Sequence, residues 1–151
     1  MSVALVFPGQ GSQVVGMGRD LYDTSPAARA IFDQADATLG FALTRLCFEG
    51  PEEALTATEN AQPALLTVSA ALLAELAPSA ERWSFVAGHS LGEYSAHVAS
   101  GTLDFADAVR IVRNRGRYMQ AAVPAGQGAM AAVLGLSLGE IEAACREAAQ
   151  G

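Results

Sequence analysis

Short apolar runs alternate along the chain with longer segments of helical periodicity. Val3–Phe7 is such a run, and Pro8-Gly9 follows it, which predicts a buried parallel strand that ends in a turn. Ser84–Ala87 and Ala129–Leu134 predict two further short strands. Helical segments separate these strands, so the pattern predicts an α/β chain.

Capping residues mark where several helices begin and end. Ser25 is a predicted N-cap with Pro26 at the first helical position, and Gly40 is a C-terminal stop. Ser137-Leu138-Gly139-Glu140 is a capping box that opens the last helix, which runs to Ala149. The other helices are predicted, in chain order, within 42–57 with a break at Gly50-Pro51, at Gln62–Leu76 ended by Pro78, at Leu91–Ser100 and at Asp104–Ala122.

The last predicted strand and helix have no obvious partner in the chain. They follow a Pro/Gly-rich linker at Val123–Gly128, and a lone strand–helix unit cannot satisfy its sheet edges or bury its faces. Either further strands escape prediction, or the chain is the front part of a longer protein. We favour the second interpretation.

Composition and charge exclude several classes of protein. The 151 residues suit one domain, and 51% hydrophobic with 17% charged residues excludes a disordered chain. The formal net charge is −7, and all nine basic residues are arginine. The sequence contains no run of basic residues, so we expect no nucleic-acid-binding surface. The absence of lysine excludes a Walker-type phosphate loop and Schiff-base chemistry.

Cysteine and histidine usage predicts neither a metal site nor a disulfide framework. Cys47 and Cys145 lie far apart in sequence, and neither they nor the two histidines have the spacing of metal ligands. The lack of a disulfide framework fits a reducing compartment. The first residues have no basic region, so we expect no signal peptide. The longest apolar stretch, Ala64–Ala77, is shorter than the roughly 20 residues of a membrane span. We therefore expect a soluble, cytoplasmic protein.

Gly88-His89-Ser90-Leu91-Gly92 matches the G-x-S-x-G nucleophile elbow. Such a Ser lies on a sharp turn between a strand and a helix, with glycines where backbones pass closely. The turn exposes the hydroxyl and puts the next backbone N–H at a helix N-terminus, where it can stabilise an oxyanion. The alternative is a structural turn with an exposed serine; the predicted strand and helix on either side favour the elbow.

No neighbouring residue is a convincing general base for Ser90. His89 is adjacent in the chain, and we expect it to pack beside the elbow. His97 is seven positions along the helix, about 10 Å away at 1.5 Å per residue. Glu93 has a spacing that suits helix capping better than catalysis. The chain thus carries a nucleophile without a base, which supports the interpretation as part of a longer protein.

Arg115 is predicted to face inward. On a helical wheel it lies near the middle of an apolar arc, whereas Arg110, Arg113 and Arg117 cluster on the opposite, solvated side. A guanidinium on an inward face must be paired, because an unpaired buried charge costs several kcal/mol. The partner is either a structural carboxylate or a substrate carboxylate.

The turn after the first strand imitates a dinucleotide fingerprint but fails it. Gly9-Gln10-Gly11 begins a G-x-G-x-x-G pattern, whose third glycine position is Val14. What remains is a glycine turn at the C-terminal end of a parallel strand, where ligands bind in open α/β sheets. Backbone N–H groups and the Gln10 amide are the available donors.

Together these segments resemble the malonyl-CoA:acyl-carrier-protein transacylase family and the acyltransferase domains of fatty-acid and polyketide synthases. The resemblance spans the chain and is carried by FPGQGSQ at 7–13, QPA at 62–64, GHSLGEY at 88–94 and RGRYMQ at 115–120. It implies that Ser90 carries the acyl group, that Arg115 pairs with the malonyl carboxylate, and that Gln62 lines the pocket. It implies an oxyanion hole from Gln10 and Leu91. Malonyl-CoA and the phosphopantetheine of an acyl carrier protein would be the partners, with no metal or redox cofactor.

The resemblance also implies a fold and a departure from it. Residues 1–126 would form the N-terminal part of an α/β-hydrolase-like large subdomain, and 127–151 the first strand and helix of a ferredoxin-like small subdomain. The family's catalytic histidine lies in a C-terminal half that this chain lacks. Two alternatives stay open: a serine hydrolase or thioesterase, and a fragment that binds substrate or a partner without catalysis.

Overall fold

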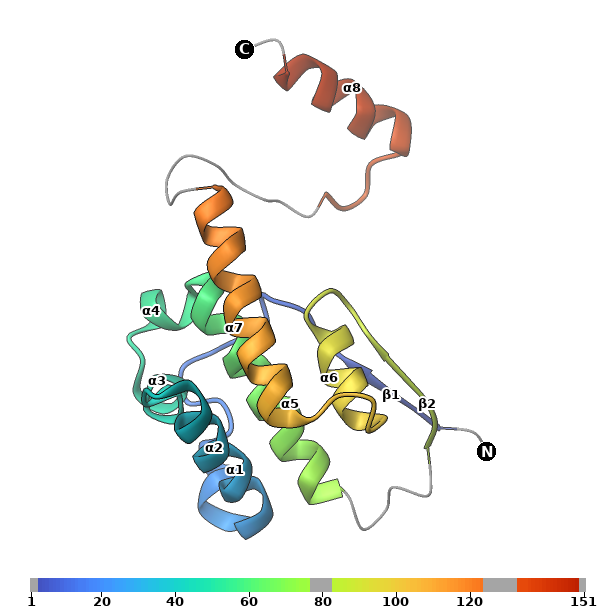
Figure 1. The fold of residues 1–151 in the computed structure, drawn as a ribbon. Helices are drawn as coiled ribbons and strands as arrows, with labels where there is room; N and C mark the ends of the chain where they lie inside the picture. Colours follow the sequence, from blue (N-terminus) through green and yellow to red (C-terminus); the bar gives the residue numbers. More distant parts are fainter. Residues whose placement is uncertain (1–2, 77–82, 124–132, 150–151) are drawn as a thin grey trace.

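The computed structural model describes residues 3–76, 83–123 and 133–149. Within them the chain is a mostly helical α/β protein with a small parallel sheet (Figure 1). The elements are, in chain order, β1 Val3–Phe7, α1 Arg19–Thr24, α2 Pro26–Leu39, α3 Leu43–Glu49, α4 Glu52–Thr56, α5 Thr58–Leu76, β2 Trp83–Gly88, α6 Gly92–Ala99, α7 Phe105–Ala122 and α8 Leu138–Ala148.

The strands β1 and β2 pair in parallel, with Phe7 opposite Gly88. Both strands therefore end at the same edge of the sheet, and the turns that follow them lie next to each other. The expectation that β1 is buried is wrong for most of the strand: Phe7 is buried, but Val6 is 74% exposed, as is Phe85 of β2 at 66%. A fully buried parallel strand needs a strand on each side and a helical layer on each face. Among the described residues the sheet has two strands, so each has an open edge.

The third predicted strand, Ala129–Leu134, lies mainly outside the described residues. Its last two residues, Val133 and Leu134, are described and belong to no strand. The predicted linker at 123–128 and the stop at Pro78 also fall largely outside. In Figure 1, α8 lies apart from the other helices, and none of its residues is buried.

Helix ends with a local capping signal occur where the sequence predicts them. The Ser25 hydroxyl accepts a hydrogen bond from the Ala28 N–H at the start of α2, and Gly40 ends that helix in the left-handed conformation at φ 73°. The break at Gly50-Pro51 separates α3 from α4. The capping box at Ser137 and Glu140 is present in full. These predictions are confirmed.

The core lies where α5 packs against α7 and α2. Helix α5 is buried over most of its first half, which confirms a buried helix, although it begins at Thr58 rather than Gln62. Phe105, Val109 and Val112 of α7 are buried against it. This packing fixes the relative positions of α5 and α7, the two helices that carry Gln62 and Arg115.

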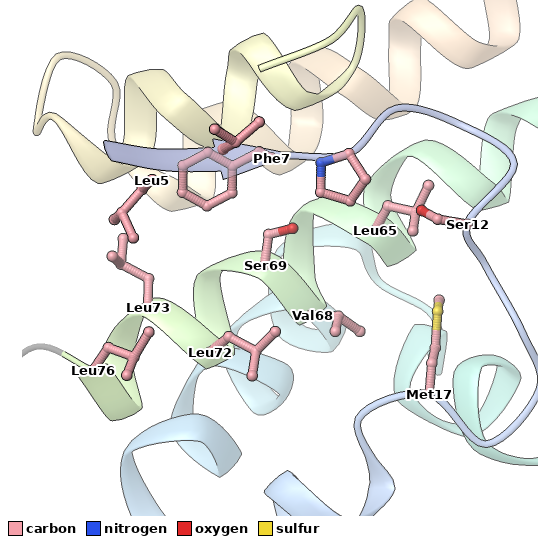
Figure 2. A pocket seen from close by; sticks show the side chains of 12 residues that line it. Leu5, Phe7, Ser12, Met17, Leu65, Val68, Ser69, Leu72, Leu73 and Leu76 are labelled. Carbon is pink, nitrogen blue, oxygen red and sulfur yellow. The ribbon is translucent and has the colours of Figure 1, made fainter. Parts of the chain in front are cut away.

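An apolar groove of about 330 Å³ lies between β1 and the second half of α5 (Figure 2). Figure 2 shows Leu5 and Phe7 of β1 opposite Leu72 and Leu73 of α5. Neither Ser90 nor Arg115 is among the residues that line the groove. It is therefore separate from the chemistry described next.

Candidate active site

Ser90 occupies a strained turn between β2 and α6. Its φ of 53° makes it the single non-glycine residue with positive φ in the described chain. Such a conformation costs about 1–3 kcal/mol and persists only where the surroundings enforce it. Here the His89 N–H donates to the Phe7 carbonyl at 3.2 Å, and the Gly92 N–H donates to the His89 carbonyl at 2.9 Å. The side chain of Ser90 is exposed above the sheet edge, as the motif predicts.

The two flanking glycines are required by close backbone approach. A Cβ atom at Gly88 would lie 2.0 Å from the carbonyl group of Gly92. A Cβ atom at Gly92 would lie 2.3 Å from the carbonyl oxygen of Phe7. Real Cβ atoms do not approach backbone atoms so closely, so neither position can take a side chain without moving the strand or the helix.

Two candidate backbone donors follow the strands at the same edge of the sheet. Leu91 directly precedes α6, so its N–H lies at the N-terminus of that helix. Gln10 follows β1, and its side-chain amide donates to Thr58 Oγ1 at 3.2 Å. Within the described part of the chain, the backbone N–H groups of Gln10 and Leu91 donate to no other residue. Both remain available to an oxyanion, and their assignment to an oxyanion hole stays a prediction.

Arg115 reaches Ser90 from α7. Its Nη1 donates to Gln62 Oε1 at 2.7 Å, and its Nη2 donates to Ser90 Oγ at 3.2 Å. The guanidinium also lies 5.8 Å from the ring centre of Tyr94. Among the ion pairs of the described residues none involves Arg115. No structural carboxylate in this part of the chain neutralises the guanidinium, which leaves its charge available beside Ser90.

Gln62 positions the guanidinium of Arg115 through a hydrogen bond. Its side chain is fully buried in α5, and its Oε1 accepts the hydrogen bond from Arg115. Its Nε2 donates to Met119 Sδ at 3.3 Å. Sequence reasoning missed Met119 and Tyr94 as members of the site. Met119 lies four residues after Arg115 on α7, and Tyr94 four residues after Ser90, so helical spacing could have suggested both.

The predicted inward arc of α7 needs two corrections. The buried residues of the helix are Phe105, Ala108, Val109, Val112 and Gly116.

Arg115 thus flanks this stripe instead of lying in its middle. Arg113 is not solvated: only 13% of its side chain is exposed, whereas Arg110 and Arg117 are exposed as predicted. The helical wheel was wrong because hydropathy does not mark Gly116 as a buried position, although its backbone packs directly against the start of α5.

No histidine contacts Ser90. The imidazole of His89 is directed toward the Gly9 backbone, consistent with packing beside the elbow, and the residue is exposed. His97 lies exposed on α6. The prediction that Glu93 caps α6 is wrong, because the helix has no side-chain cap. Among the described residues, Arg115 is the hydrogen-bond partner of Ser90 Oγ, and no general base lies in reach.

The described residues include neither a metal-binding cluster nor a membrane-spanning helix. No group of three or more His, Cys, Asp or Glu side chains there could hold a metal ion. No helix among them is long and apolar enough to cross a membrane.

Comparison with known proteins gives consistent matches along the chain. Residues 4–150 match the family described as acyl transferase domain. The chain is 59% identical over 134 residues to malonyl CoA-acyl carrier protein transacylase of Bacillus subtilis (strain 168), covering 89% of this chain and 42% of the relative. It is 52% identical over 149 residues to the Escherichia coli (strain K12) protein of the same name, covering 98% and 48%.

Solved structures give the same result. An acyl-carrier-protein-S-malonyltransferase from Bartonella henselae superposes with a TM-score of 0.92 at 46% identity, over 99% of this chain and 49% of that one. A type II PKS acyl-carrier protein in complex with its malonyl-transacylase gives 0.92 at 47% identity, over 100% and 49%. The chain spans about half the length of these relatives.

Proposed function

The chain belongs to the acyl transferase domain family, and on that premise we propose that the protein transfers a malonyl group from malonyl-CoA to the phosphopantetheine thiol of an acyl carrier protein. The family membership agrees with the resemblance carried by the sequence motifs. The observation that carries the proposal is the contact of Arg115 with both Ser90 and Gln62. A cation beside an exposed elbow serine suits an acyl group that itself ends in a carboxylate.

The proposed reaction proceeds in two transfers through Ser90. Ser90 Oγ attacks the thioester carbonyl, the new C–O bond forms, the C–S bond breaks, and CoA leaves with a proton. The carrier thiol then attacks the malonyl ester, a new C–S bond forms, the C–O bond to Ser90 breaks, and the proton of the carrier thiol passes to Ser90 Oγ. The N–H groups of Gln10 and Leu91 would stabilise the oxyanion in both steps. The base that moves the proton would be the histidine that the family resemblance places outside these 151 residues.

Arg115 would orient the malonyl group. Its Nη2 is in hydrogen-bond reach of Ser90 Oγ, so a carboxylate attached through one methylene to the reacting carbonyl can exchange for Ser90 as its partner. Buried Gln62 supports the guanidinium from the protein side. An acetyl group offers no carboxylate, and the free energy of this contact would distinguish the two substrates.

We also propose how the chain divides between two subdomains. We assign residues 1–126 to the N-terminal part of an α/β-hydrolase-like large subdomain and 127–151 to the start of a ferredoxin-like small subdomain. The parallel pair β1–β2 and the strand–elbow–helix order support the first assignment. The open sheet edges and the apolar groove beside β1 support a sheet completed by a C-terminal half of the same protein. The reaction needs no cofactor, and free Cys47 and Cys145 suit a cytoplasmic location.

One experiment separates this proposal from hydrolysis. The full-length protein is mixed with malonyl-CoA, with and without acyl carrier protein, and the products are measured by mass spectrometry. The proposal expects malonylated carrier protein and little free malonate. Free malonate in equal yield with and without the carrier would identify a thioesterase instead.

A further inference from the structure

Helices α5 and α7 pack backbone against backbone at Gly116, the residue directly after Arg115. A Cβ atom at Gly116 would lie 2.6 Å from the Cα atom of Glu59 and 2.7 Å from the carbonyl oxygen of Thr58. The two backbones therefore touch at this point. Because side chains cannot adjust around a backbone contact, a small shift here moves both helices as rigid bodies.

Arg113 ties the same two segments together. Its Nη1 donates to the Glu59 carbonyl at 2.7 Å and to the Asn60 side-chain oxygen, and its Nη2 lies 3.3 Å from Glu59 Oε2. The guanidinium also covers the ring of Phe41, 4.8 Å from its centre. Burial lowers the pKa of Arg113, and the Glu59 carboxylate opposes that shift. On the exposed side, Arg117 lies 3.5 Å from the same Glu59 oxygen.

Three site residues lie directly beside the contacts that Arg113 and Gly116 make with the start of α5. Arg115 lies between Arg113 and Arg117 on α7, and Gln62 lies one turn after Glu59 on α5. Thr58, whose carbonyl faces Gly116, accepts the side-chain hydrogen bond of Gln10. The backbone positions of Arg115 and Gln62, and the hydrogen-bond partner of the Gln10 side chain, thus depend on how α7 meets the first turn of α5.

We propose that Arg113 and Glu59, with Gly116 between the helices, form a positioning clamp that sets the selectivity for carboxylated acyl groups. The clamp touches no reacting atom. It fixes the guanidinium of Arg115 against Gln62 and within reach of Ser90. The proposal rests on the proposed function, since it concerns how the malonyl carboxylate is recognised. A site residue displaced by about 1 Å can lose about a hundredfold in rate, so a clamp of this kind has a measurable effect.

The test uses the full-length protein and the ratio of kcat/KM for malonyl-CoA to that for acetyl-CoA. Arg113→Gln removes the charge and the ion pair. The matched control is Arg110→Gln on the same helix, where the arginine pairs with Asp107 on the exposed face. We expect the ratio to fall at least about tenfold in Arg113→Gln and to change less than about twofold in the control. Loss of stability alone lowers both substrates equally and leaves the ratio unchanged.

A second variant covers the case in which Arg113→Gln fails to fold. Glu59→Gln is nearly isosteric, keeps the backbone carbonyl that Arg113 uses, and removes the ion pairs to Arg113 and Arg117. We expect a fall in the ratio of about threefold or more. A ratio unchanged in both folded variants, or in Glu59→Gln alone when the other does not fold, overturns the clamp. A wild-type protein without malonyl transfer overturns the proposed function first, and the clamp with it.

Discussion

Replacing Arg115 by alanine is expected to lower kcat/KM for malonyl-CoA far more than for acetyl-CoA. The change removes the guanidinium that donates to Gln62 at 2.7 Å and to Ser90 at 3.2 Å. One of its effects falls on both substrates. Gln62 is fully buried, and its Oε1 would lose a partner, which costs about 1–3 kcal/mol whichever acyl group is bound.

The second effect falls on the carboxylated substrate alone. A hydrogen bond to a charged group contributes about 1.5–3 kcal/mol. Arg115 is half-buried, so we take a value near the lower end. About 2 kcal/mol corresponds to roughly thirtyfold in kcat/KM, at 1.36 kcal/mol per factor of ten. The malonyl-to-acetyl ratio should therefore fall by about thirtyfold, because the cost at Gln62 cancels in the ratio.

Initial rates with each acyl-CoA at a fixed carrier concentration give this ratio, and Arg110→Ala on the exposed face of α7 is the control. Equal losses for both substrates would show that Arg115 does not bind the malonyl carboxylate. Arg115 would then be a structural residue that supports Gln62, and selectivity would reside elsewhere.

Three further predictions follow from the packing and from the thiols. Gly92→Ala should lose transfer activity, and its free energy of unfolding in a chemical denaturation should fall by about 1–3 kcal/mol, because its Cβ would meet the Phe7 carbonyl. A denaturation midpoint equal to that of the wild type would contradict this. The isolated chain 1–151 should malonylate no carrier protein and show no cooperative thermal unfolding, since among the described residues no base lies in reach of Ser90 and the sheet edges are open; turnover near that of the full-length protein would disprove it. At pH 8, iodoacetamide should label Cys145 and spare Cys47, because burial raises the pKa of Cys47 to about 12; equal labelling in peptide mass spectra would count against the buried thiol.

Features that depend on neighbouring residues in the chain were predictable from the sequence. Ser25 and the Ser137 capping box begin helices, and Gly40 ends one, through bonds to residues about one turn away, so the local sequence contains the whole signal. The elbow glycines belong to the same class. By contrast, α1 is six residues long and begins at Arg19 after Gly18, which provides no side-chain cap.

Features set by contacts between distant segments were not predictable in this way. The burial of Arg113 depends on Glu59 and Phe41, and a helical wheel contains no information about either. The same holds for the sulfur of Met119 as the partner of Gln62. The exposure of Val6 depends on which strands lie beside β1, a property of the whole sheet and not of the apolar run itself.

Intact-mass measurement shows whether Ser90 carries the malonyl group as a covalent ester. The full-length protein and its Ser90→Ala variant are incubated with malonyl-CoA without carrier protein, and each is weighed by mass spectrometry. The elbow geometry, with a positive φ that exposes Oγ, predicts a malonyl adduct on the wild type that is absent from Ser90→Ala. An adduct of undiminished yield on Ser90→Ala would contradict the account.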